Sequence, residues 1–486
     1  MNLEPVQIGV FIFLTALIAL VTYWKCKDQP RTGDSNREYF LAGGGLSWVF
    51  VAGSITLTNL STDQLVGMNG SQMMLVALWE LSAVVGLFIL AGIFVPIYYK
   101  YKCTTTTELL ERRYKNKHIR ATISLLFLAA NVFVFIPAVL YTGSLFMQSV
   151  FQFDFPLIYI AIAFAVLGAA YSIFGGLRAV AVSDTFSGVL LLGLAVLVVY
   201  LALKAINFDF SGIPKERLTL IGGDDSDIPW HTLLTGMLLI QIFYWSTNQV
   251  ITQRAMASPT VKEAQKGVIA AALIRLVIVP PIIVIPGIVS YKLYGSIGDA
   301  AYGQIVGDLL PPWLVGAFAA AITAAVLTSF NSMLNSSVAL YVCDIHEKYF
   351  DDKPNVPKLS AWITLGFTLI ALLLVPIYQD ARSIIDTLQR LWGIFSMPIL
   401  STFIVGLVFR NVNAWAAIVA ALAGACVYGF LIYNPMGLDW LPHYIHLMFI
   451  NFFFCIAVAL LVNRFVFGQK SEFVLGQPLL EEGESY

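Results

Sequence analysis

The chain has 486 residues, of which 58% are hydrophobic and 12% are charged. Soluble globular domains carry about 25% charged residues, so this composition excludes a soluble protein and indicates an all-α polytopic membrane protein. The net charge of −1 is uninformative by itself, because the distribution of charge decides the topology of a membrane protein. The cysteines show no paired spacing, so we predict neither a disulfide framework nor a cysteine metal site.

Apolar segments long enough to cross about 30 Å of hydrocarbon predict about 13 transmembrane helices. The first apolar run has no cationic flank and no small-residue cleavage site, so we predict a retained helix instead of a signal peptide. The predicted spans are 6–24, 48–69, 76–99, 121–150, 156–174, 180–206, 229–253, 266–292, 312–342, 358–378, 383–409, 413–433 and 441–466.

Lysine and arginine predict the orientation of the chain. With the N-terminus outside, most basic residues fall in cytoplasmic loops, and the C-terminus is cytoplasmic, as the positive-inside rule requires. The outer loops then keep only Lys215, Arg217, Lys292 and Arg382. We expect a multi-pass protein of the cell (inner or plasma) membrane.

The stretch Gly53–Gly70 lies where a span is expected but is rich in hydroxyl and amide side chains. Polar groups in hydrocarbon are costly unless they are satisfied or line an enclosed cavity. The glycines and hydroxyls favour a helix that breaks midway, which is how secondary transporters hold a cation and a polar solute. We therefore predict a binding site here and assign Asn59 and Gln64 to it, although hydrogen bonding between helices is the alternative.

Other polar groups lie inside predicted spans. Glu80 is a carboxylate in an apolar run, and Arg275 must pair with Glu80 or point into water. The pair Gly175–Gly176 predicts a tight turn between two helices, which places Asp184 about one turn inside the second. Asp184 could pair with Arg178 or supply negative charge near a cation, and the sequence favours neither.

The segment after residue 320 carries hydroxyls on or near one helical face: Thr328, Ser329, Ser332, Ser336 and Ser337. Hydroxyls and carbonyls are the oxygen ligands that hard cations prefer, but small residues also allow close packing. Trp79, Tyr244 and Trp245 could be helix contacts or could cover a ligand. From the sequence alone, we favour close helix packing as the role of the hydroxyl-rich segment after residue 320.

With these residues collected, the chain resembles the sodium/solute symporter family, in its sodium/glucose-type branch, which includes the bacterial sodium/galactose symporter. The blocks that carry the resemblance appear in family order: EYFLAGGGLSW, NLSTDQLVGMNG, YSIFGGLRAVAVSD, FYWSTNQVITQRAMA with KEAQKG, SMLNSS and GIFSMP. The resemblance implies a LeuT-like inverted repeat of five plus five helices with discontinuous helices, made by the second through eleventh spans.

The resemblance also implies the roles of particular residues. Those expected to contact or cover a sugar are Asn59, Gln64, Trp79, Glu80, Gln241, Tyr244, Trp245, Arg275 and Gln389. Sodium would bind the backbone carbonyls of Leu57, Leu60 and Ala325 and the hydroxyls of Thr328 and Ser329, with Asp184 nearby or in a second ion site. The co-transported ion is Na⁺.

The expected organisation follows from these assignments. Residues 1–47 hold the first helix and a cytoplasmic loop, 48–206 and 229–409 the two repeats, 207–228 an extracytoplasmic loop, 410–467 two further helices, and 468–486 a cytoplasmic tail. We predict a sodium symporter that imports a sugar, such as galactose or glucose, by alternating access. Its partners are the sugar, sodium and the bilayer, with no nucleic acid and no obligate protein partner evident.

Several alternatives stay open. The solute could instead be a polyol, a sialic acid or an amino acid, and a carboxylate substrate could meet Arg275 if Glu80 does not neutralise it. Coupling to protons would need a titrating carboxylate, for which Asp184 is the candidate. A membrane sensor would need a signalling module that the short tail cannot form. An enzyme is not expected, since the histidines lie in loops or at helix ends, where only His443 and His446 are close in sequence.

Overall fold

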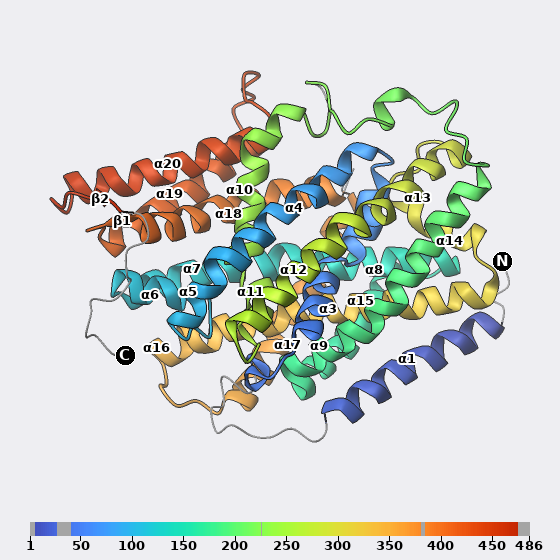
Figure 1. Cartoon of the computed structure of the whole chain (residues 1–486), viewed down its shortest axis with the longest axis horizontal. Helices are drawn as coiled ribbons and strands as arrows, with labels where there is room; N and C mark the ends of the chain where they lie inside the picture. Colours follow the sequence, from blue (N-terminus) through green and yellow to red (C-terminus); the bar gives the residue numbers. More distant parts are fainter. Residues whose placement is uncertain (1–4, 27–39, 225, 381–383, 475–486) are drawn as a thin grey trace.

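The computed structural model describes residues 5–26, 40–224, 226–380 and 384–474. The basic residues expected between 27 and 39, Arg382, and the tail beyond residue 474 lie outside the described part. Figure 1 shows an elongated bundle of helices in which the two ends of the described chain lie on opposite sides.

The α-helices of the first half are α1 (Pro5–Cys26), α3 (Trp48–Asn59), α4 (Leu78–Ile89), α5 (Val95–Lys100), α6 (Glu108–Tyr114), α7 (Lys117–Ala130), α8 (Ile136–Phe151) and α9 (Leu157–Ala205). Those of the second half are α10 (Gly236–Ile242), α11 (Gln249–Met256), α12 (Val261–Val277), α13 (Val279–Tyr294), α14 (Ala301–Leu309), α15 (Pro312–Ala339), α16 (Glu347–Tyr349), α17 (Val356–Leu374), α18 (Ile384–Val408), α19 (Ala414–Tyr433) and α20 (Tyr444–Phe465).

Short π-helical segments, with wider turns, and 3₁₀ segments, with tighter turns, lie between or next to these α-helices. The π-helical segments are η2 (Asp63–Met68), η4 (Leu90–Phe94), η5 (Asn131–Phe135), η8 (Phe243–Thr247) and η10 (Leu340–His346). The 3₁₀ segments are η1 (Ala42–Gly44), η3 (Met74–Ala77), η6 (Lys215–Arg217), η7 (Trp230–Leu234), η9 (Gly298–Ala300) and η11 (Val375–Asp380). Strands β1 (Phe409–Arg410) and β2 (Glu472–Phe473) pair antiparallel beside the end of α18.

Within the described residues, ten helical segments are long and apolar enough to cross a membrane. They match ten of the thirteen predicted spans. The predicted spans 48–69 and 229–253 are instead the two interrupted ones, made of α3 with η2 and of α10, η8 and α11. The remaining predicted span, 156–174, corresponds to the shorter apolar helical segment Leu157–Ile173.

The predicted turn at Gly175–Gly176 falls inside α9, which is assigned as helix from Leu157 to Ala205. A straight helix of this length would measure about 73 Å, more than twice the hydrocarbon thickness. Both parts of α9 lie near the same part of α15: a Cβ on Gly168 would lie against Phe330, while Asp184 and Ser332 both lie within 3.5 Å of the Thr58 hydroxyl. One helical assignment thus covers both predicted crossings, and this geometry favours the change of direction between them that the glycine pair predicts.

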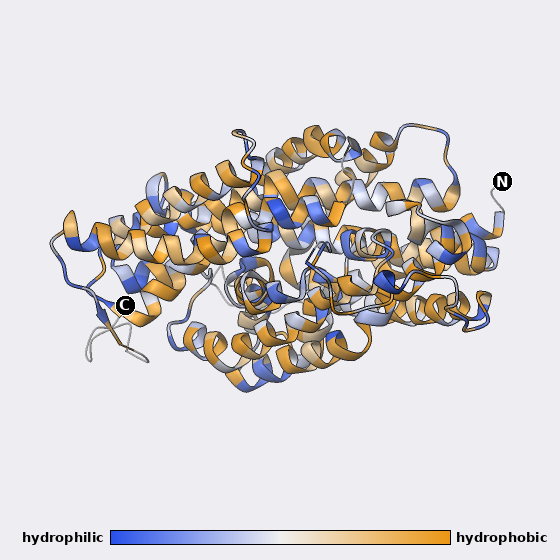
Figure 2. Cartoon of the chain, turned by 90° about the horizontal axis from the view of Figure 1, so that it is seen from above, coloured by the Kyte–Doolittle hydropathy of each residue, from blue (hydrophilic) through white to orange (hydrophobic). Residues whose placement is uncertain are grey.

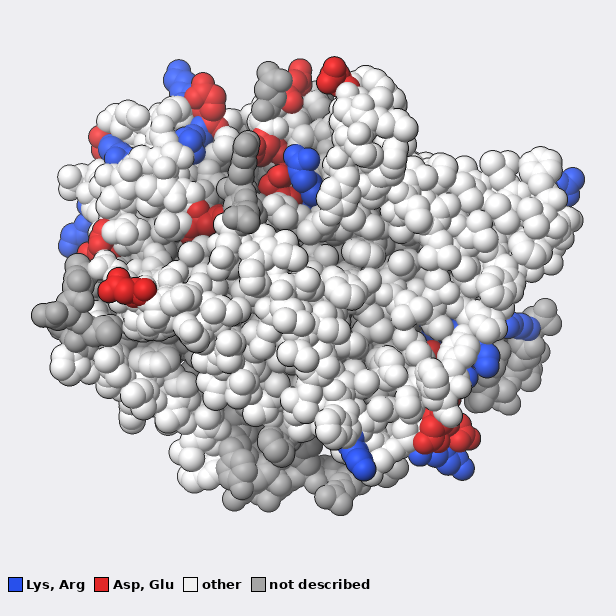
Figure 3. All heavy atoms as spheres, turned by 180° about the vertical axis from the view of Figure 1, so that it is seen from behind, with Lys and Arg blue, Asp and Glu red and all other residues white. Residues whose placement is uncertain are grey.

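The outer surface of the bundle is apolar. Figure 2 shows most helical turns coloured as hydrophobic, and α1 exposes Ile12, Phe13 and Leu20 to 53–65%. Figure 3 shows most Lys, Arg, Asp and Glu side chains at two opposite sides of the molecule, with a broad uncharged band between them. This is the pattern of a chain that spans a bilayer. We call the side formed by residues 206–235 and 434–443 the acidic-loop face.

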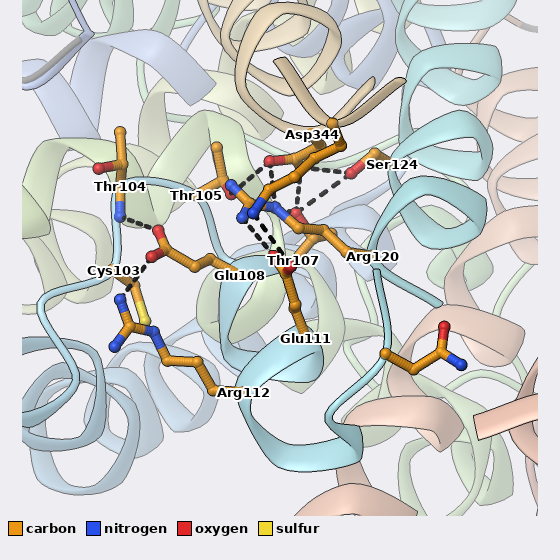
Figure 4. Close-up of polar contacts among 12 residues, drawn as sticks. Cys103, Thr104, Thr105, Thr107, Glu108, Glu111, Arg112, Arg120, Ser124 and Asp344 are labelled. Atoms are coloured by element: carbon orange, nitrogen blue, oxygen red, sulfur yellow. Dashed lines mark hydrogen bonds and ion pairs between the residues drawn. The ribbon is translucent and has the colours of Figure 1, made fainter. Parts of the chain in front are cut away.

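On the opposite side, a buried carboxylate ties the loop after α5 to α7 and η10. Asp344 is fully buried and accepts hydrogen bonds from Thr105 (2.8 Å), Thr107 and Ser124, and the Arg120 guanidinium lies 2.7 Å from it. Figure 4 shows these side chains converging on Asp344 from different segments. Because a buried charge is tolerated only when it is paired and hydrogen-bonded, this cluster fixes the ends of the helices relative to one another.

On the acidic-loop face, Asp299 in η9 packs against the end of η2, where a Cβ on Gly70 would clash with it. Its Oδ2 accepts a hydrogen bond from the backbone N–H of Ile384 (3.4 Å). Burial raises the pKa of Asp299 from 3.8 to about 6. Between these two pH values the folded state binds more protons than the unfolded chain, so this contribution to stability is present at low pH and is lost as the pH rises through about 6.

We expect Asp299→Asn to stabilise the protein at pH 7.5 by about 1–3 kcal/mol, because the variant removes a desolvated charge. The gain should shrink as the pH falls toward 4. Thermal unfolding of the purified protein in detergent, followed at both pH values, measures the difference. Asp439→Asn, in an exposed loop on the same face, is the matched control, and an equal gain from Asp299→Asn at both pH values would contradict the prediction.

Candidate functional site

The helix that begins at Trp48 is interrupted after Asn59. Leu60 leaves the helical conformation (φ −75°, ψ 69°), and the N–H of Ser61 donates to the carbonyl of Asn59 at 2.8 Å. In a continuing α-helix that N–H would donate to the carbonyl of Leu57. The chain then resumes as the π-helix η2, so the predicted discontinuous helix is confirmed.

The second interruption follows α10. The π-helix η8 ends at Thr247, and Asn248 is extended (φ −70°, ψ 123°) before α11 begins. The Asn248 side chain caps α11 by accepting from the N–H of Val250 at 3.0 Å. The first interruption lies in the span that its polar residues marked, and residues of both interrupted segments line the same cavity.

The cavity has a volume of about 60 Å³ and lies between the two interrupted helices, α4 and α18. Of the nine residues predicted to contact substrate, eight line it: Asn59, Gln64, Trp79, Glu80, Gln241, Tyr244, Trp245 and Gln389. Its remaining lining residues are Thr58, Ser61, Asp63, Met68, Phe135, Ile240, Met333, Ile385, Leu388 and Trp392. None of the described lining residues is Lys or Arg.

Arg275 is the predicted contact that does not line the cavity. It is fully buried behind the wall, where its Nη2 lies 2.5 Å from Glu80 Oε2. The same guanidinium donates to the carbonyl of Thr56 (3.1 Å), to Gln64 Oε1 (3.2 Å) and to the side chain of Asn59. Of the two alternatives for Arg275, the structure therefore shows the ion pair with Glu80 and not exposure to water.

Glu80 also orients Gln64, whose amide nitrogen donates to its Oε1 at 2.6 Å. Asn59 donates to the hydroxyl of Tyr244 at 2.9 Å. These bonds link α3, η2, α4, η8 and α12 around one side of the cavity and hold the polar groups in place before any solute binds.

Gln241 lines the cavity, but its amide is used by the protein. The nitrogen donates to the carbonyl of Trp79 (2.7 Å) and to Ser82 (3.0 Å), and the oxygen accepts from the indole N–H of Trp245 (2.9 Å). Since a Cβ on Gly86 would lie 2.4 Å from the carbonyl of Gln241, α4 and α10 are in backbone contact here. Gln241 therefore positions Trp79 and Trp245 within the site.

Among the ten lining residues that were not predicted as contacts, Trp392 and Asp63 offer the groups most relevant to a polar solute. Trp392 packs edge to face against Tyr244, with ring centroids 5.9 Å apart, and its spacing of three residues from Gln389 could have placed it on the same helical face. Asp63 is buried, and its Oδ1 has no hydrogen-bond partner in the described structure. Its position beside Gln64 in the interrupted segment was the available signal.

The cavity adjoins a hollow of about 340 Å³ on the acidic-loop face. Trp79, Ile385 and Gln389 line both spaces, and the hollow is further lined by Ser71, Asp386 and Arg390, among others. A solute that arrives from the acidic-loop face would therefore pass these three side chains. The small cavity volume indicates that they must move to admit a solute larger than water.

Next to the cavity, α15 packs against the end of α3, where Thr58 is a lining residue. Ser329 donates to the carbonyl of Thr58 at 3.4 Å, while Thr328, Ala325, Leu57 and Leu60 are all buried nearby on these two helices. Ser336 instead donates to Gln253 (2.8 Å), and Ser337 accepts from Asn131 (3.1 Å). The hydroxyl face is thus divided between the end of α3 and ordinary contacts between helices.

Asp184 lies beside this region. Ser54 donates to its Oδ2 at 2.5 Å, and the Thr58 hydroxyl lies 3.5 Å away. Its Oδ1 is buried without a partner in the described structure. Arg254, which the sequence analysis did not consider, donates to Ser54 at 2.9 Å and balances the carboxylate. The side chain of Arg178, the alternative partner, lies outside the described part.

The comparisons with known proteins agree with this architecture. A model of the sodium:solute symporter family matches residues 39–424. An uncharacterized symporter of Escherichia coli (strain K12), YidK, is 34% identical over 88% of this chain and 78% of its own length. The sodium/glucose cotransporter of Vibrio parahaemolyticus is 29% identical over 92% of this chain and 88% of its own length. The structure of a Na⁺-coupled sialic acid symporter in a substrate-bound outward-open state superposes with a TM-score of 0.80, at 19% identity, and covers 95% of this chain and 98% of that one.

The fold with its two interrupted helices is LeuT-like, and the match to a family of symporters makes the chain a secondary transporter and not an enzyme. The chain belongs to the sodium:solute symporter family. It is a multi-pass membrane protein that couples the transport of a solute to Na⁺.

We expect the pair Arg275–Glu80 to dominate the stability of the site. Arg275→Met and Glu80→Gln should each destabilise the protein by about 3–5 kcal/mol, because each leaves the other group buried without its partner. The double variant should lose clearly less than the sum of the two. Thermal unfolding in detergent measures all three variants.

Gln389→Ala is the control for this cycle, since Gln389 lines the same cavity but is only half-buried. It should change the free energy of unfolding by less than about 1 kcal/mol. Additive losses in the double variant would show that Arg275 and Glu80 act independently.

Proposed function

We propose that the chain imports a neutral, polyhydroxylated solute, a hexose such as galactose or glucose, together with Na⁺. The observation that carries this proposal is the composition of the cavity wall. It offers carboxylate and amide groups from Asp63, Glu80, Gln64 and Gln389, beside the aromatic rings of Tyr244 and Trp392. Donors and acceptors around an apolar face suit a ring of hydroxyl groups.

The charge of the wall favours a neutral solute over an anionic one. Arg275 contacts lining residues from behind the wall and is neutralised by Glu80, and Arg390, in the adjoining hollow, pairs with Asp386 at 2.7 Å. Asp63 Oδ1, without a partner in the described structure, adds an acceptor. A sialic acid or an amino acid would bring a carboxylate to a wall without a free cation, so we place both below sugars.

A polyol is the second candidate, because it presents the same hydroxyl groups to the same wall. The similarity to the sodium/glucose cotransporter of Vibrio parahaemolyticus supports the sugar. Within the site we assign solute contact to Asn59, Gln64, Glu80 and Gln389 and solute covering to the aromatic residues Trp79, Tyr244 and Trp245. Arg275 and Gln241 act by positioning these groups.

For sodium we propose the carbonyls of Leu57, Leu60 and Ala325 and the hydroxyls of Thr328 and Ser329. The redirected N–H of Ser61 and the contact between Ser329 and the last turn of α3 support this set. Oxygen ligands without a full charge suit a monovalent cation. Asp184, with one unpartnered oxygen, is the proposed second or accessory ion position.

Coupling follows if sodium between α3 and α15 favours the conformation in which the solute site is complete. One Na⁺ that crosses about −100 mV supplies roughly 2.3 kcal/mol, and a tenfold sodium gradient adds roughly 1.4 kcal/mol. Together these could concentrate a neutral solute about 500-fold. We place the protein in the cell membrane with the N-terminus outside and the acidic-loop face external, on the positive-inside rule.

The test is uptake of labelled galactose and glucose into proteoliposomes with and without an inward sodium gradient. We expect sodium to stimulate uptake in the wild type and Ser329→Ala to reduce that stimulation at least tenfold, because one proposed ligand is lost. Thr328→Ser, which keeps its hydroxyl, is the matched control and should retain sodium stimulation.

Uptake of either sugar that is indifferent to sodium would overturn the proposed coupling. Absence of uptake of both sugars, with sodium-dependent uptake of a polyol in the same vesicles, would replace the sugar by the second candidate.

A further inference from the structure

Two histidines far apart in sequence meet on the acidic-loop face. His231 lies in η7, His446 lies in the first turn of α20, and Nδ1 of His231 is 2.6 Å from Nε2 of His446. The ring planes differ by 16° and the ring centroids are 4.7 Å apart. Since the two nitrogens are closer than stacked ring faces could be, the rings meet through their nitrogen edges. His443, which is near His446 in sequence, lies outside this pair.

The other nitrogen of each ring faces an oxygen. Nε2 of His231 is 3.3 Å from the carboxylate of Asp224, which can accept a hydrogen that this nitrogen carries. Nδ1 of His446 is 2.9 Å from the hydroxyl of Thr235, and that hydroxyl donates its own hydrogen to the carbonyl of Thr232 at 3.1 Å. The hydroxyl can therefore accept a hydrogen that Nδ1 of His446 carries.

When both neutral rings carry their hydrogens on these outer nitrogens, the facing nitrogens present two lone pairs to each other across 2.6 Å. When one hydrogen sits on a facing nitrogen instead, the two rings are joined by a hydrogen bond. In the first tautomer the facing nitrogens can hold a cation, and each imidazole is oriented from behind by an acceptor. This is the arrangement that metal-binding histidines adopt.

We propose that His231 and His446 bind a late first-row divalent metal ion, with Zn²⁺ as the probe. Neutral imidazole nitrogen is a preferred zinc ligand at about 2.0–2.1 Å, and two ligands at a tetrahedral angle are about 3.3 Å apart. The nitrogens need to separate by about 0.7 Å to reach that spacing. His231 is 35% exposed, so side-chain rotation can supply the movement.

Water would complete the coordination. Among the described residues, no group of three or more His, Cys, Asp and Glu is arranged to hold a metal. Two protein ligands predict affinity in the micromolar range, which is that of a regulatory ion and not of a permanent structural one.

The site bridges two helices that already touch. Figure 1 shows the start of α10 beside α20, and a Cβ on Gly236 would lie 1.9 Å from the carbonyl of Ile445. Gly236 follows Thr235 and Ile445 precedes His446, so this backbone contact holds the two imidazoles next to each other. A bound metal would fasten the beginning of α10 to α20.

α10 carries Gln241 and leads into Tyr244 and Trp245, so fastening it should hinder movement at the solute cavity. This part rests on the proposed function. We therefore expect Zn²⁺ on the acidic-loop face to slow sodium-driven uptake, and chelation to restore it.

Zinc binding itself is measured on the whole purified protein, after treatment with EDTA, by isothermal titration calorimetry in the absence of sugar. We expect one Zn²⁺ per chain with micromolar affinity. His231→Ala and His446→Ala should each weaken binding at least tenfold, whereas His443→Ala, which removes a neighbouring histidine outside the pair, should retain it. X-ray absorption of the zinc complex should show two imidazole ligands in the wild type.

No zinc binding by the wild type, or equal binding by His446→Ala, would overturn the site and leave a histidine pair that shares only a proton. Zinc binding without any effect of Zn²⁺ on uptake would overturn the fastening of α10. Failure of the proposed function is distinct from both, because it would abolish sugar uptake in the absence of zinc and leave the calorimetry unchanged.

Discussion

The site depends on one guanidinium group that lies at the end of an interrupted helix. In a membrane each polar group without a partner costs several kcal/mol. Arg275, from α12, donates to the carbonyl of Thr56 and to the side chains of Asn59 and Gln64, while Glu80 balances its charge. The interruption, the buried carboxylate and the polar wall of the cavity are therefore one bonded unit. Removing any member would expose the others to the same cost.

Consecutive residues of α3 serve both proposed sites, which gives coupling a short physical route. Asn59 bonds to Tyr244 and Arg275 at the solute cavity. Thr58, the residue before it, offers its carbonyl to Ser329 and its hydroxyl to Asp184. A change in the packing of α15 against α3 would thus move a group at the solute cavity without any intermediate element. This proximity makes the end of α3 the candidate for the two-state element that linkage between the proposed ion and solute sites requires.

Much of this architecture could be predicted from the sequence, because lengths of apolar segments and misplaced polar groups are local signals. They predicted the spans and the first interruption, whereas the second interruption and cavity residues such as Gln241 and Gln389 were expected from the family resemblance. Local signals could not show that Gln241 is saturated by Trp79 and Trp245, that Arg254 reaches Asp184 through Ser54, or that His446 meets His231. Each of these depends on which helices pack together. The glycine pair at 175 and 176 predicted a change of direction, but not that helical assignment continues through it.

The π-helical turns have a consequence for comparing related chains. A π-turn holds one residue more than an α-turn, so the side chains after it are rotated by about 100° relative to an uninterrupted α-helix. Such turns occur in η2, η4, η5, η8 and η10, within or beside the helices that form the transport core. A relative that lacks one residue in such a turn could keep both flanking helices in place with a regular α-turn. Single-residue gaps in sequence alignments therefore belong at these turns. An alignment without the gap would assign the residues after a π-turn to the wrong face of the following helix.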